Sequence, residues 1–280
     1  MNTLRGIPGR RRSRAVRLSR LIKLIDTARS EPGPCHDSLS YHAWVSPKYH
    51  YLYVSVPKAA CTKVKRSLQM LEGYPVPTGR GDIHRRSLPG CPFLPSVLDF
   101  DTELAIEILT SADWFRFCFV RNPYYRLFSA YKSKILSETD GHYGRIRDEI
   151  RIQNKYPVRD GHPAGMVAFR DFVRYVIGIR DLHRDSHWHS QARLLMLDVI
   201  DYSFIGRVEK FPEDFKNVLS RLGLPEGSMV LDPSEVVNPT VGIYHAAVFD
   251  RKMADQVYRA FKVDFEAFGY DRDSWMIDFD

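Results

Sequence analysis

The sequence predicts an α/β fold in which parallel strands lead into helices through short turns. Two segments support this prediction, because each passes from a dense apolar run to helical spacing. They are 51–71, YLYVSVPKAACTKVKRSLQML, and 114–135, WFRFCFVRNPYYRLFSAYKSKI. Runs rich in aromatic and β-branched residues are typical of strands buried on both faces of a parallel sheet. With 280 residues, 44% of them hydrophobic, the chain can bury a full core.

In the first segment, we expect a strand over 51–56, an end at Pro57, a turn of small residues, and a helix with Thr62 as its cap. Such a junction points backbone N–H groups and the positive end of the helix dipole at one place, which suits an anion. The groups expected around the anion are Lys58, Ala59, Ala60, Cys61, Thr62, Lys63, Lys65 and Arg66. The nucleotide-triphosphatase pattern GxxxxGK[ST] is absent, since this turn has no glycine and its lysine precedes it. The alternative is a strand–helix junction with solvated lysines.

The second segment repeats this logic with a strand over 115–120, a turn at 122–123 and a helix over 125–135. Arg121 stands at the carboxyl end of the strand, where open α/β sheets bind ligands, and Ser129 follows eight residues later. A guanidinium fork and a hydroxyl group can grip a phosphate dianion. The alternative is an incidental Arg/Ser pair in a strand–turn–helix unit.

The net charge of +7 belongs to the first thirty residues, which hold nine basic residues and one acidic residue. The rest of the chain keeps 32 basic and 33 acidic residues and is nearly neutral, so specific nucleic-acid binding by the body is not expected. We therefore expect a basic arm and hinge over 1–36 and one domain over 37–280. Three interpretations of the arm remain open: a disordered tail, a helix on an anionic membrane surface, and a nucleic-acid or targeting tail.

The four cysteines show neither CxxC nor Cys/His ligand spacing, so the sequence predicts no zinc site and no dense disulfide framework. Amphipathic spacing predicts helices over 102–110 and 211–222. The first of them ends a less regular, Pro- and Gly-rich connection over 72–112 between the two strand–helix segments. A stretch of this kind inside a compact domain is usually functional or mobile. It contains His84, which as a loop histidine beside two arginines would ordinarily be solvated.

Both segments resemble motifs of the sulfotransferases that use 3′-phosphoadenosine 5′-phosphosulfate (PAPS). VPKAACTKVKR resembles their 5′-phosphosulfate loop, and RNPYYRLFSAYKSK resembles their 3′-phosphate motif, in the branch that contains chondroitin 4-O- and heparan 2-O-sulfotransferases. Three further landmarks follow in the familiar order: His187-Trp188, then 202–209 as YSFIGRVE, then 264–271 as DFEAFGYD. The resemblance runs from about Tyr41 to Tyr270. Ser190 and the run 194–197 replace a proline or cysteine pair that relatives often carry.

The resemblance implies a P-loop-like sulfotransferase fold, with a central, mainly parallel sheet, helices on both faces and both motif strands near the middle. The donor would be PAPS, and no metal would be needed. Donor-binding residues would be Lys58, Ala59, Ala60, Cys61, Thr62 and Lys63 at the 5′ end, and Arg121 and Ser129 at the 3′ end. Lys58 would also stabilise the leaving group, and Arg126 would be structural. Asn238 and Thr240 fall where related chains bring a loop over the nucleotide.

A base must take the proton of the acceptor hydroxyl, and histidine is matched to this task near neutral pH. His84 is the first candidate, because it lies between the two phosphate motifs as the catalytic histidine does in heparan 2-O-sulfotransferases. His187 is the second. We expect a carbohydrate, glycolipid or other glycan as the acceptor. The charged helix over 129–155 and the region 180–189 are candidates for its groove, with a solvated charged helix as the alternative.

Without an apolar anchor in the sequence, we expect a cytoplasmic, bacterial enzyme, peripheral at the membrane if the arm binds lipid. Two other functions remain in view. One is a non-catalytic module of the same fold that binds glycan or nucleic acid through the arm. The other is a P-loop kinase, which would need Mg²⁺ and a Gly-Lys-Ser/Thr sequence that the chain lacks.

Overall fold

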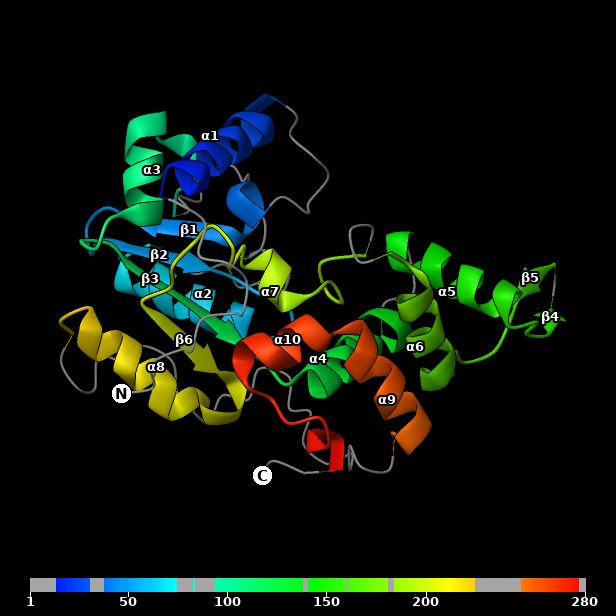
Figure 1. The fold of residues 1–280 in the computed structure, drawn as a ribbon. Coiled ribbons are helices and arrows are strands. Elements are labelled where there is room, and N and C mark those ends of the chain that lie inside the picture. Colours follow the sequence, from blue (N-terminus) through cyan, green and yellow to red (C-terminus); the bar gives the residue numbers. More distant parts are fainter. Residues whose placement is uncertain are drawn as a thin grey trace. The chain divides into compact units, whose positions relative to one another are not determined.

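The computed structural model describes residues 14–30, 38–74, 83, 94–137, 141–159, 161–180, 184–224 and 248–276 (Figure 1). The chain divides into two compact units. The first comprises Met1–Val120 and Gln191–Pro239, and the second comprises Arg121–Ser190 and Thr240–Asp280. Within the described ranges, none of the helices has both the length and the apolar character needed to cross a membrane.

The first unit is built on a four-stranded sheet with the order β1–β2–β3–β6. Its strands are β1 (Ala43–Ser46), β2 (Tyr51–Val54), β3 (Phe115–Val120) and β6 (Phe204–Arg207). β1 pairs with β2 in antiparallel register, whereas the β2–β3 and β3–β6 pairs are parallel. The carboxyl ends of β2, β3 and β6 therefore lie at one edge of the sheet. The prediction of a mainly parallel sheet with both motif strands in the middle is confirmed for the described residues.

Helices cover both faces of this sheet (Figure 1). On one face, aromatic side chains of β2 and β3 pack against α2 (Cys61–Leu71) and α8 (Phe211–Arg221). The main contributors are Tyr51, Tyr53, Phe117, Phe119, Val64, Leu68, Phe215 and Val218. On the other face, α3 (Thr102–Thr110) packs against β2 and buries Ala105, Ile108 and Leu109. The helices predicted over 102–110 and 211–222 are thus confirmed. Four short helices of the described residues also belong to this unit: η1 (Ser38–His42), η3 (Val97–Asp99), α7 (Gln191–Leu194) and η6 (Val208–Lys210).

The basic arm differs from the expectation. Residues 14–30 form α1 (Arg14–Ser30), which packs against α3 and belongs to the first unit. Leu21 and Ile25 are fully buried, and Arg17 Nε donates a hydrogen bond to the Val199 carbonyl oxygen over 2.7 Å. This part of the arm is neither a disordered tail nor separate from the domain that was expected to begin at residue 37. Residues 1–13 and the hinge residues 31–36 lie outside the described ranges.

Gly206 is the position of β6 that tolerates no side chain. A Cβ atom built there would lie 2.4 Å from Cε1 of Phe119 on the neighbouring strand. Because β3 and β6 must stay paired, Gly206→Ala is expected to destabilise the protein by about 1–3 kcal/mol, the usual cost of overpacking. The midpoint of thermal unfolding should fall accordingly. The control is Gly178→Ala, since nothing lies within 4 Å of a Cβ at Gly178, and an equal fall in both variants would contradict this explanation.

The second unit is helical. Its elements are α4 (Pro123–Ala130), the π-helix η4 (Tyr131–Leu136), α5 (Gly141–Gln153), α6 (Phe169–Gly178), α9 (Arg251–Ala260), α10 (Lys262–Phe268), η8 (Ser274–Met276) and a small hairpin of β4 (Val158–Arg159) and β5 (His162–Pro163). The core is aromatic, and it includes Tyr124, Phe128, Phe172, Trp188 and Phe265. The helix expected over 129–155 is therefore split, because the π-helical turn ends at Leu136 and a new helix begins at Gly141.

Candidate functional site

The turn between β2 and α2 is strained. Lys58 and Ala60 have φ angles of 68° and 55°, in the left-handed region that residues with a Cβ atom seldom occupy. Each such residue costs about 1–3 kcal/mol and persists only where the surroundings impose it, as they do at binding sites. The sequence could not reveal this, since a turn without glycine would ordinarily avoid positive φ.

The helix α2 begins immediately after this turn. Ala60 is its N-cap, with no side-chain hydrogen bond, so the prediction that Thr62 caps the helix is wrong. The Val64 N–H donates to the Ala60 carbonyl oxygen over 3.1 Å. The amides of 61–63 therefore precede the helix's own hydrogen-bond ladder, and a helix start of this kind is a suitable place for a phosphate or sulfate group. The residues present fit the 5′ end of the donor.

The lysines after the turn differ in where their charges lie. Lys58 and Lys63 are half-buried, and the Lys63 ammonium group lies 5.2 Å from the centroid of the Phe211 ring. Lys65 is almost fully buried, with Nζ 4.6 Å from the centroid of the Trp44 ring and 5.2 Å from that of Tyr41. Its charge is held inside the first unit by cation–π contacts. The expectation that Lys65 surrounds the anion is therefore replaced by a structural role.

The segment that resembles a 3′-phosphate motif begins where β3 ends. Arg121 is the residue after Val120, and Asn122 and Pro123 start α4 as its N-cap and its first residue, so they form a helix cap as well as a turn. The Asn122 side-chain oxygen accepts a hydrogen bond from the Tyr124 N–H over 3.0 Å. Ser129 lies in the last turn of α4, and both Arg121 and Ser129 are half-buried. Ser129 is held on α4, and Arg121 lies in the one-residue connection between β3 and the N-cap of α4, so both positions are fixed by well-defined elements.

The end of the chain holds α4 in place. The Asn122 side-chain amide donates to Ser274 Oγ over 2.8 Å, and the Tyr125 hydroxyl donates to the Ser274 carbonyl oxygen over 2.7 Å. The Tyr124 hydroxyl donates to the Arg272 carbonyl oxygen over 2.7 Å, and burial raises the pKa of Tyr124, so it remains a donor. Sequence reasoning missed these contacts. The only signal was the presence of both RNPYY and the closing DFEAFGYD motif in one chain.

Arg126 connects α4 to the segment that carries the second histidine candidate. Its two terminal nitrogens donate hydrogen bonds of 2.7 Å each to the carbonyl oxygens of Ser186 and His189. The structural role expected for Arg126 is confirmed, although it holds the segment 186–189 and not the turn before the helix. The same segment is tied to the closing motif, since Ser190 Oγ donates to a carboxylate oxygen of the fully buried Asp264 over 2.7 Å.

His187 is half-buried, and its Nδ1 lies 3.0 Å from the Tyr143 hydroxyl of α5. The two regions predicted to form an acceptor groove, 129–155 and 180–189, therefore meet here. The other histidine candidate, His84, and the two candidate loop residues, Asn238 and Thr240, lie outside the described residues.

In the part of the chain that the structure describes, no group of three or more His, Cys, Asp or Glu side chains is arranged to hold a metal ion. That the reaction needs no metal ion stays a prediction.

Comparison with known proteins identifies the class to which this fold and site belong. The model of the sulfotransferase family matches residues 41–271, so the chain belongs to that family. It is 28% identical over 243 residues to carbohydrate sulfotransferase 14 of Danio rerio, which covers 83% of this chain and 63% of that protein. It is 30% identical over 247 residues to carbohydrate sulfotransferase 14 of Mus musculus, an alignment that covers 83% of this chain and 61% of that protein. It is 29% identical over 187 residues to carbohydrate sulfotransferase 8 of Homo sapiens, an alignment that covers 65% of this chain and 43% of that protein.

The chain thus spans about three fifths of the length of the first of these relatives. No solved structure matches it significantly.

Proposed function

We propose that this protein is a sulfotransferase that transfers the sulfuryl group of PAPS to a hydroxyl group of a carbohydrate or glycoconjugate. The observation that supports this most is that two neighbouring parallel strands each lead into a helix through a short turn, and that the first turn contains Lys58 and the second contains Arg121. Membership of the sulfotransferase family and the names of its curated relatives support the same reaction and a carbohydrate acceptor.

The reaction forms a bond between the acceptor oxygen and sulfur and breaks the bond between sulfur and the oxygen that bridges to the 5′-phosphate. The bridging oxygen keeps the electron pair and leaves as part of the 3′,5′-bisphosphate. Lys58 and the amides at the start of α2 are suited to stabilise that developing charge. Oriented binding of both substrates can remove about 7–11 kcal/mol of the barrier at the favourable limit.

Arg121 and Ser129 would hold the 3′-phosphate of the donor, while the β2–α2 turn holds the 5′ end. A grip at both ends fixes the direction of the leaving group, and it also distinguishes PAPS from nucleotides that lack a 3′-phosphate. The acceptor hydroxyl then needs a base. Two candidates stand, His84 and His187, and of these His187 belongs to the described residues.

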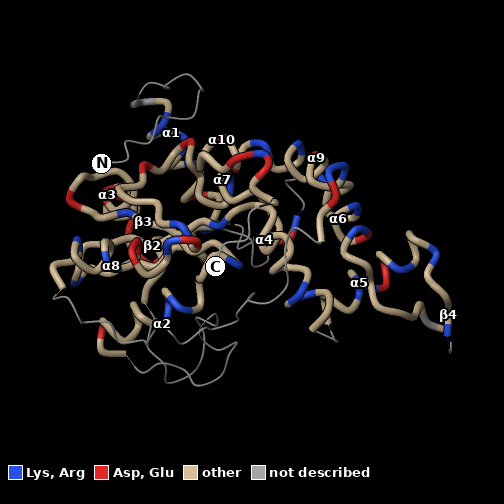
Figure 2. Tube along the Cα trace, turned by 90° about the horizontal axis from the view of Figure 1, so that it is seen from below, with Lys and Arg blue, Asp and Glu red and all other residues tan. Residues whose placement is uncertain are grey.

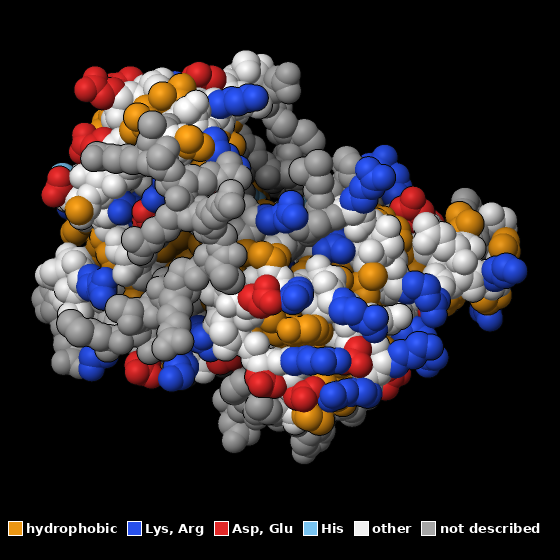
Figure 3. All heavy atoms as spheres, viewed as in Figure 1, with side chains coloured by type: hydrophobic (Ala, Val, Ile, Leu, Met, Phe, Trp, Pro, Cys, Tyr) orange, Lys and Arg blue, Asp and Glu red, His pale blue; other side chains and the backbone are white. Residues whose placement is uncertain are grey.

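The surface of the second unit suits a hydrophilic acceptor. Lys and Arg residues lie along α5 and α9, with Asp and Glu residues between them (Figure 2). Figure 3 shows Lys and Arg side chains on the surface of this unit, with Asp and Glu side chains beside them. Several of these charges are paired, for example Arg151 with Asp148 at 2.9 Å and Arg272 with Asp255 at 2.7 Å. A mixed, partly paired surface favours a neutral or weakly acidic glycan over a strongly anionic polymer. The cytoplasmic location and the contact with an anionic membrane stay predictions.

The first test is calorimetric titration with 3′-phosphoadenosine 5′-phosphate, the product that remains after transfer. Selective binding of this bisphosphate over AMP and over ATP with Mg²⁺ is expected. Preference for ATP with Mg²⁺, or no nucleotide binding by the folded protein, would overturn the proposal.

A non-catalytic module that works through the arm is tested by removing residues 1–13 alone, because a deletion to residue 30 would also remove the buried Leu21 and Ile25.

Arg121→Ala is expected to weaken binding of the bisphosphate by about 10- to 100-fold, since hydrogen bonds to charged groups are worth roughly 1.5–3 kcal/mol. Binding of AMP should change little, because AMP has no 3′-phosphate. The measurement is the same titration with both nucleotides. Arg170→Ala, which removes an exposed arginine of α6, is the control. An equal loss for both nucleotides in Arg121→Ala would assign that residue to another part of the donor.

A further inference from the structure

The β4–β5 hairpin lies at the end of α5, beyond the other helices of the second unit (Figures 1 and 2). The three most exposed large apolar side chains of the described residues all belong to this region. Ile152 and Val158 are each 66% exposed, and Met166 is 74% exposed. One exposed apolar residue needs no explanation, but three in one short segment mark a surface that meets another molecule or a membrane.

The hairpin is a folded element and not a loose loop. β4 and β5 pair in antiparallel register, and the Ala164 N–H donates to the Pro157 carbonyl oxygen over 2.8 Å. Arg151 of α5 donates from Nε to the Gly165 carbonyl oxygen over 2.9 Å. The two arms of the hairpin are thus tied to each other and to the end of α5. The exposed apolar side chains therefore stand on one small structure.

Tyr156 attaches the hairpin to α6 through polar contacts. Its hydroxyl accepts the Ala168 N–H over 2.8 Å and donates to Oδ2 of Asp171 over 2.8 Å. A Cβ atom built at Gly165 would lie 3.4 Å from Cδ1 of the Tyr156 ring, so the return arm passes close to that ring. The side that faces the unit therefore includes hydrogen-bonded polar groups, while large apolar groups face the solvent. Water by itself favours the reverse arrangement.

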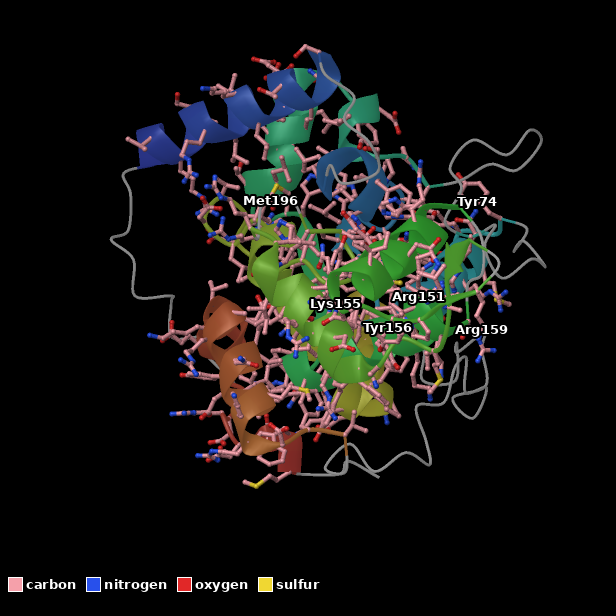
Figure 4. All side chains as sticks on the ribbon, turned by 90° about the vertical axis from the view of Figure 1, so that its right-hand side faces the viewer. Tyr74, Arg151, Lys155, Tyr156, Arg159 and Met196 are labelled. Carbon is pink, nitrogen blue, oxygen red and sulfur yellow. The ribbon has the colours of Figure 1, made fainter. Side chains whose placement is uncertain are left out.

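Basic residues accompany the exposed apolar groups. The stretch 151–166, RIQNKYPVRDGHPAGM, contains Arg151, Lys155 and Arg159 and one acidic residue, Asp160, which lies outside the described residues. Arg151 is paired with a carboxylate of its own helix, whereas Lys155 and Arg159 are exposed. Figure 4, in which this end of the unit faces the viewer, shows them on the two sides of Tyr156. In Figure 3, hydrophobic and basic side chains lie together over the hairpin.

Aliphatic and basic groups at a projecting end fit an anionic lipid surface better than a glycan or a protein. A glycan is covered with hydroxyl groups that need hydrogen bonds, so exposed aliphatic groups add little to its binding. A specific protein interface buries about 800 Å² on each partner, and aromatic residues are enriched in its core. A bilayer, in contrast, takes up small apolar groups beneath its headgroups and attracts cations at its surface.

We propose that the second unit docks on an anionic lipid surface through the β4–β5 hairpin. Ile152, Val158 and Met166 insert among the lipid headgroups, and Lys155 and Arg159 lie against the headgroup anions. Both kinds of attraction are needed, because stable attachment of a protein to a membrane usually takes two signals. The sequence suggested a lipid contact through the basic arm, whereas this proposal places it in the second unit. It does not depend on the proposed reaction.

The first test is sedimentation of the full-length protein with vesicles of equimolar phosphatidylcholine and phosphatidylglycerol. The protein is expected to bind these vesicles, to bind vesicles of phosphatidylcholine alone much more weakly, and to be released by high salt. Hydrogen–deuterium exchange of the bound protein should slow over 152–166 and stay unchanged over 251–260, which is α9. Absence of vesicle binding, or slowing that leaves 152–166 unaffected, would overturn the proposal.

The second test replaces the apolar side chains by polar ones of similar shape. Val158→Thr and Met166→Gln are each expected to weaken vesicle binding by about 10-fold, because burial of such a side chain contributes at least this much. Both positions are exposed, so the midpoint of thermal unfolding should not change. Met276→Gln is the matched control, since Met276 is 52% exposed and belongs to the same unit. An equal loss in the control, or no loss in the two variants, would contradict insertion of the hairpin.

The third test removes the cations. Lys155 has a φ of 56°, and asparagine adopts this left-handed conformation more readily than most residues, so Lys155→Asn keeps the turn. Lys155→Asn and Arg159→Gln are each expected to weaken binding to the anionic vesicles by about 5-fold and to leave binding to neutral vesicles unchanged. The control is Lys252→Gln, which removes an exposed lysine of α9. Equal losses on both kinds of vesicle would contradict a role for these charges.

The rival occupants of the hairpin and the rival membrane contact give different results. If removal of residues 1–13 abolishes vesicle binding while the hairpin variants bind normally, the contact belongs to the arm and the proposal is wrong. If the protein ignores vesicles but self-associates in sedimentation velocity, and Val158→Thr and Met166→Gln make it monomeric, the hairpin joins two copies of the chain. If the protein ignores vesicles but binds chondroitin sulfate through Lys155 and Arg159, the hairpin is a glycan site. Each of these results would overturn the lipid surface.

Discussion

Replacement of His187 by alanine is expected to lower turnover by about 10²–10⁴-fold while the protein still binds the 3′,5′-bisphosphate normally. A positioned general base contributes this much to a reaction in which a hydroxyl must lose its proton. The hydroxyl of a sugar is far too weak an acid to ionise near neutral pH without help. Because a general base acts on the acceptor hydroxyl and not on the nucleotide, its loss should affect the chemical step and leave nucleotide affinity unchanged.

His189→Ala is the matched control for this experiment. His189 belongs to the same segment and is also half-buried, and its Nδ1 lies 3.2 Å from the carbonyl oxygen of Ser190. The contact of Arg126 with His189 involves the backbone and survives the substitution. His84→Ala provides the other comparison. Normal turnover in His187→Ala together with a large loss in His84→Ala would assign the base to His84.

Lys58→Ala is expected to lower kcat by about 10²–10³-fold, the effect of removing one preorganised group that stabilises developing charge. The physical reason is the charge that appears on the bridging oxygen as the S–O bond breaks. The loss should exceed any loss in bisphosphate affinity, since the lysine acts most strongly in the transition state. Rates and nucleotide affinities measured on the same preparation will separate the two effects. A loss confined to affinity would make Lys58 a binding residue only.

The strain at Lys58 calls for a second variant. Lys58→Gly removes the same ammonium group but accepts a φ of 68° without cost, so it is expected to be at least as stable as the unmodified protein. Equal loss of turnover in the alanine and glycine variants would assign the effect to charge. Lys48→Ala is the control for charge elsewhere in the first unit, since Lys48 is exposed and its ammonium group lies over the ring of Tyr49.

Local pattern was sufficient to predict the elements that form the framework of the site. The dense apolar runs before Lys58 and Arg121 became β2 and β3, which occupy the middle of the sheet and pair in parallel. The helices α3 and α8 also begin where their spacing predicted. These features depend on the alternation of side chains along a strand or around a helix, and a single stretch of sequence contains that information.

Pattern was misleading where a side chain finds a partner outside its own element. Lys65 has the sequence context of an anion-binding lysine, yet it is buried between the rings of Tyr41 and Trp44. The basic residues before position 30 suggested an arm, yet Leu21 and Ile25 bury α1 against the first unit. In both cases the charge was visible in the sequence, and the apolar surface that decides the outcome was not.

The sequence by itself determined the two strand–turn–helix units that carry the proposed phosphate-binding residues, because each unit is one continuous stretch of chain. Only the tertiary structure decided how these units are held and what surrounds His187. Asn122 meets Ser274 across 152 positions, and His187 meets Tyr143 across 44. Contacts of this kind depend on how helices pack and on which buried polar groups must find partners. Neither condition leaves a periodic signal in the chain, so these contacts can be known only from the fold.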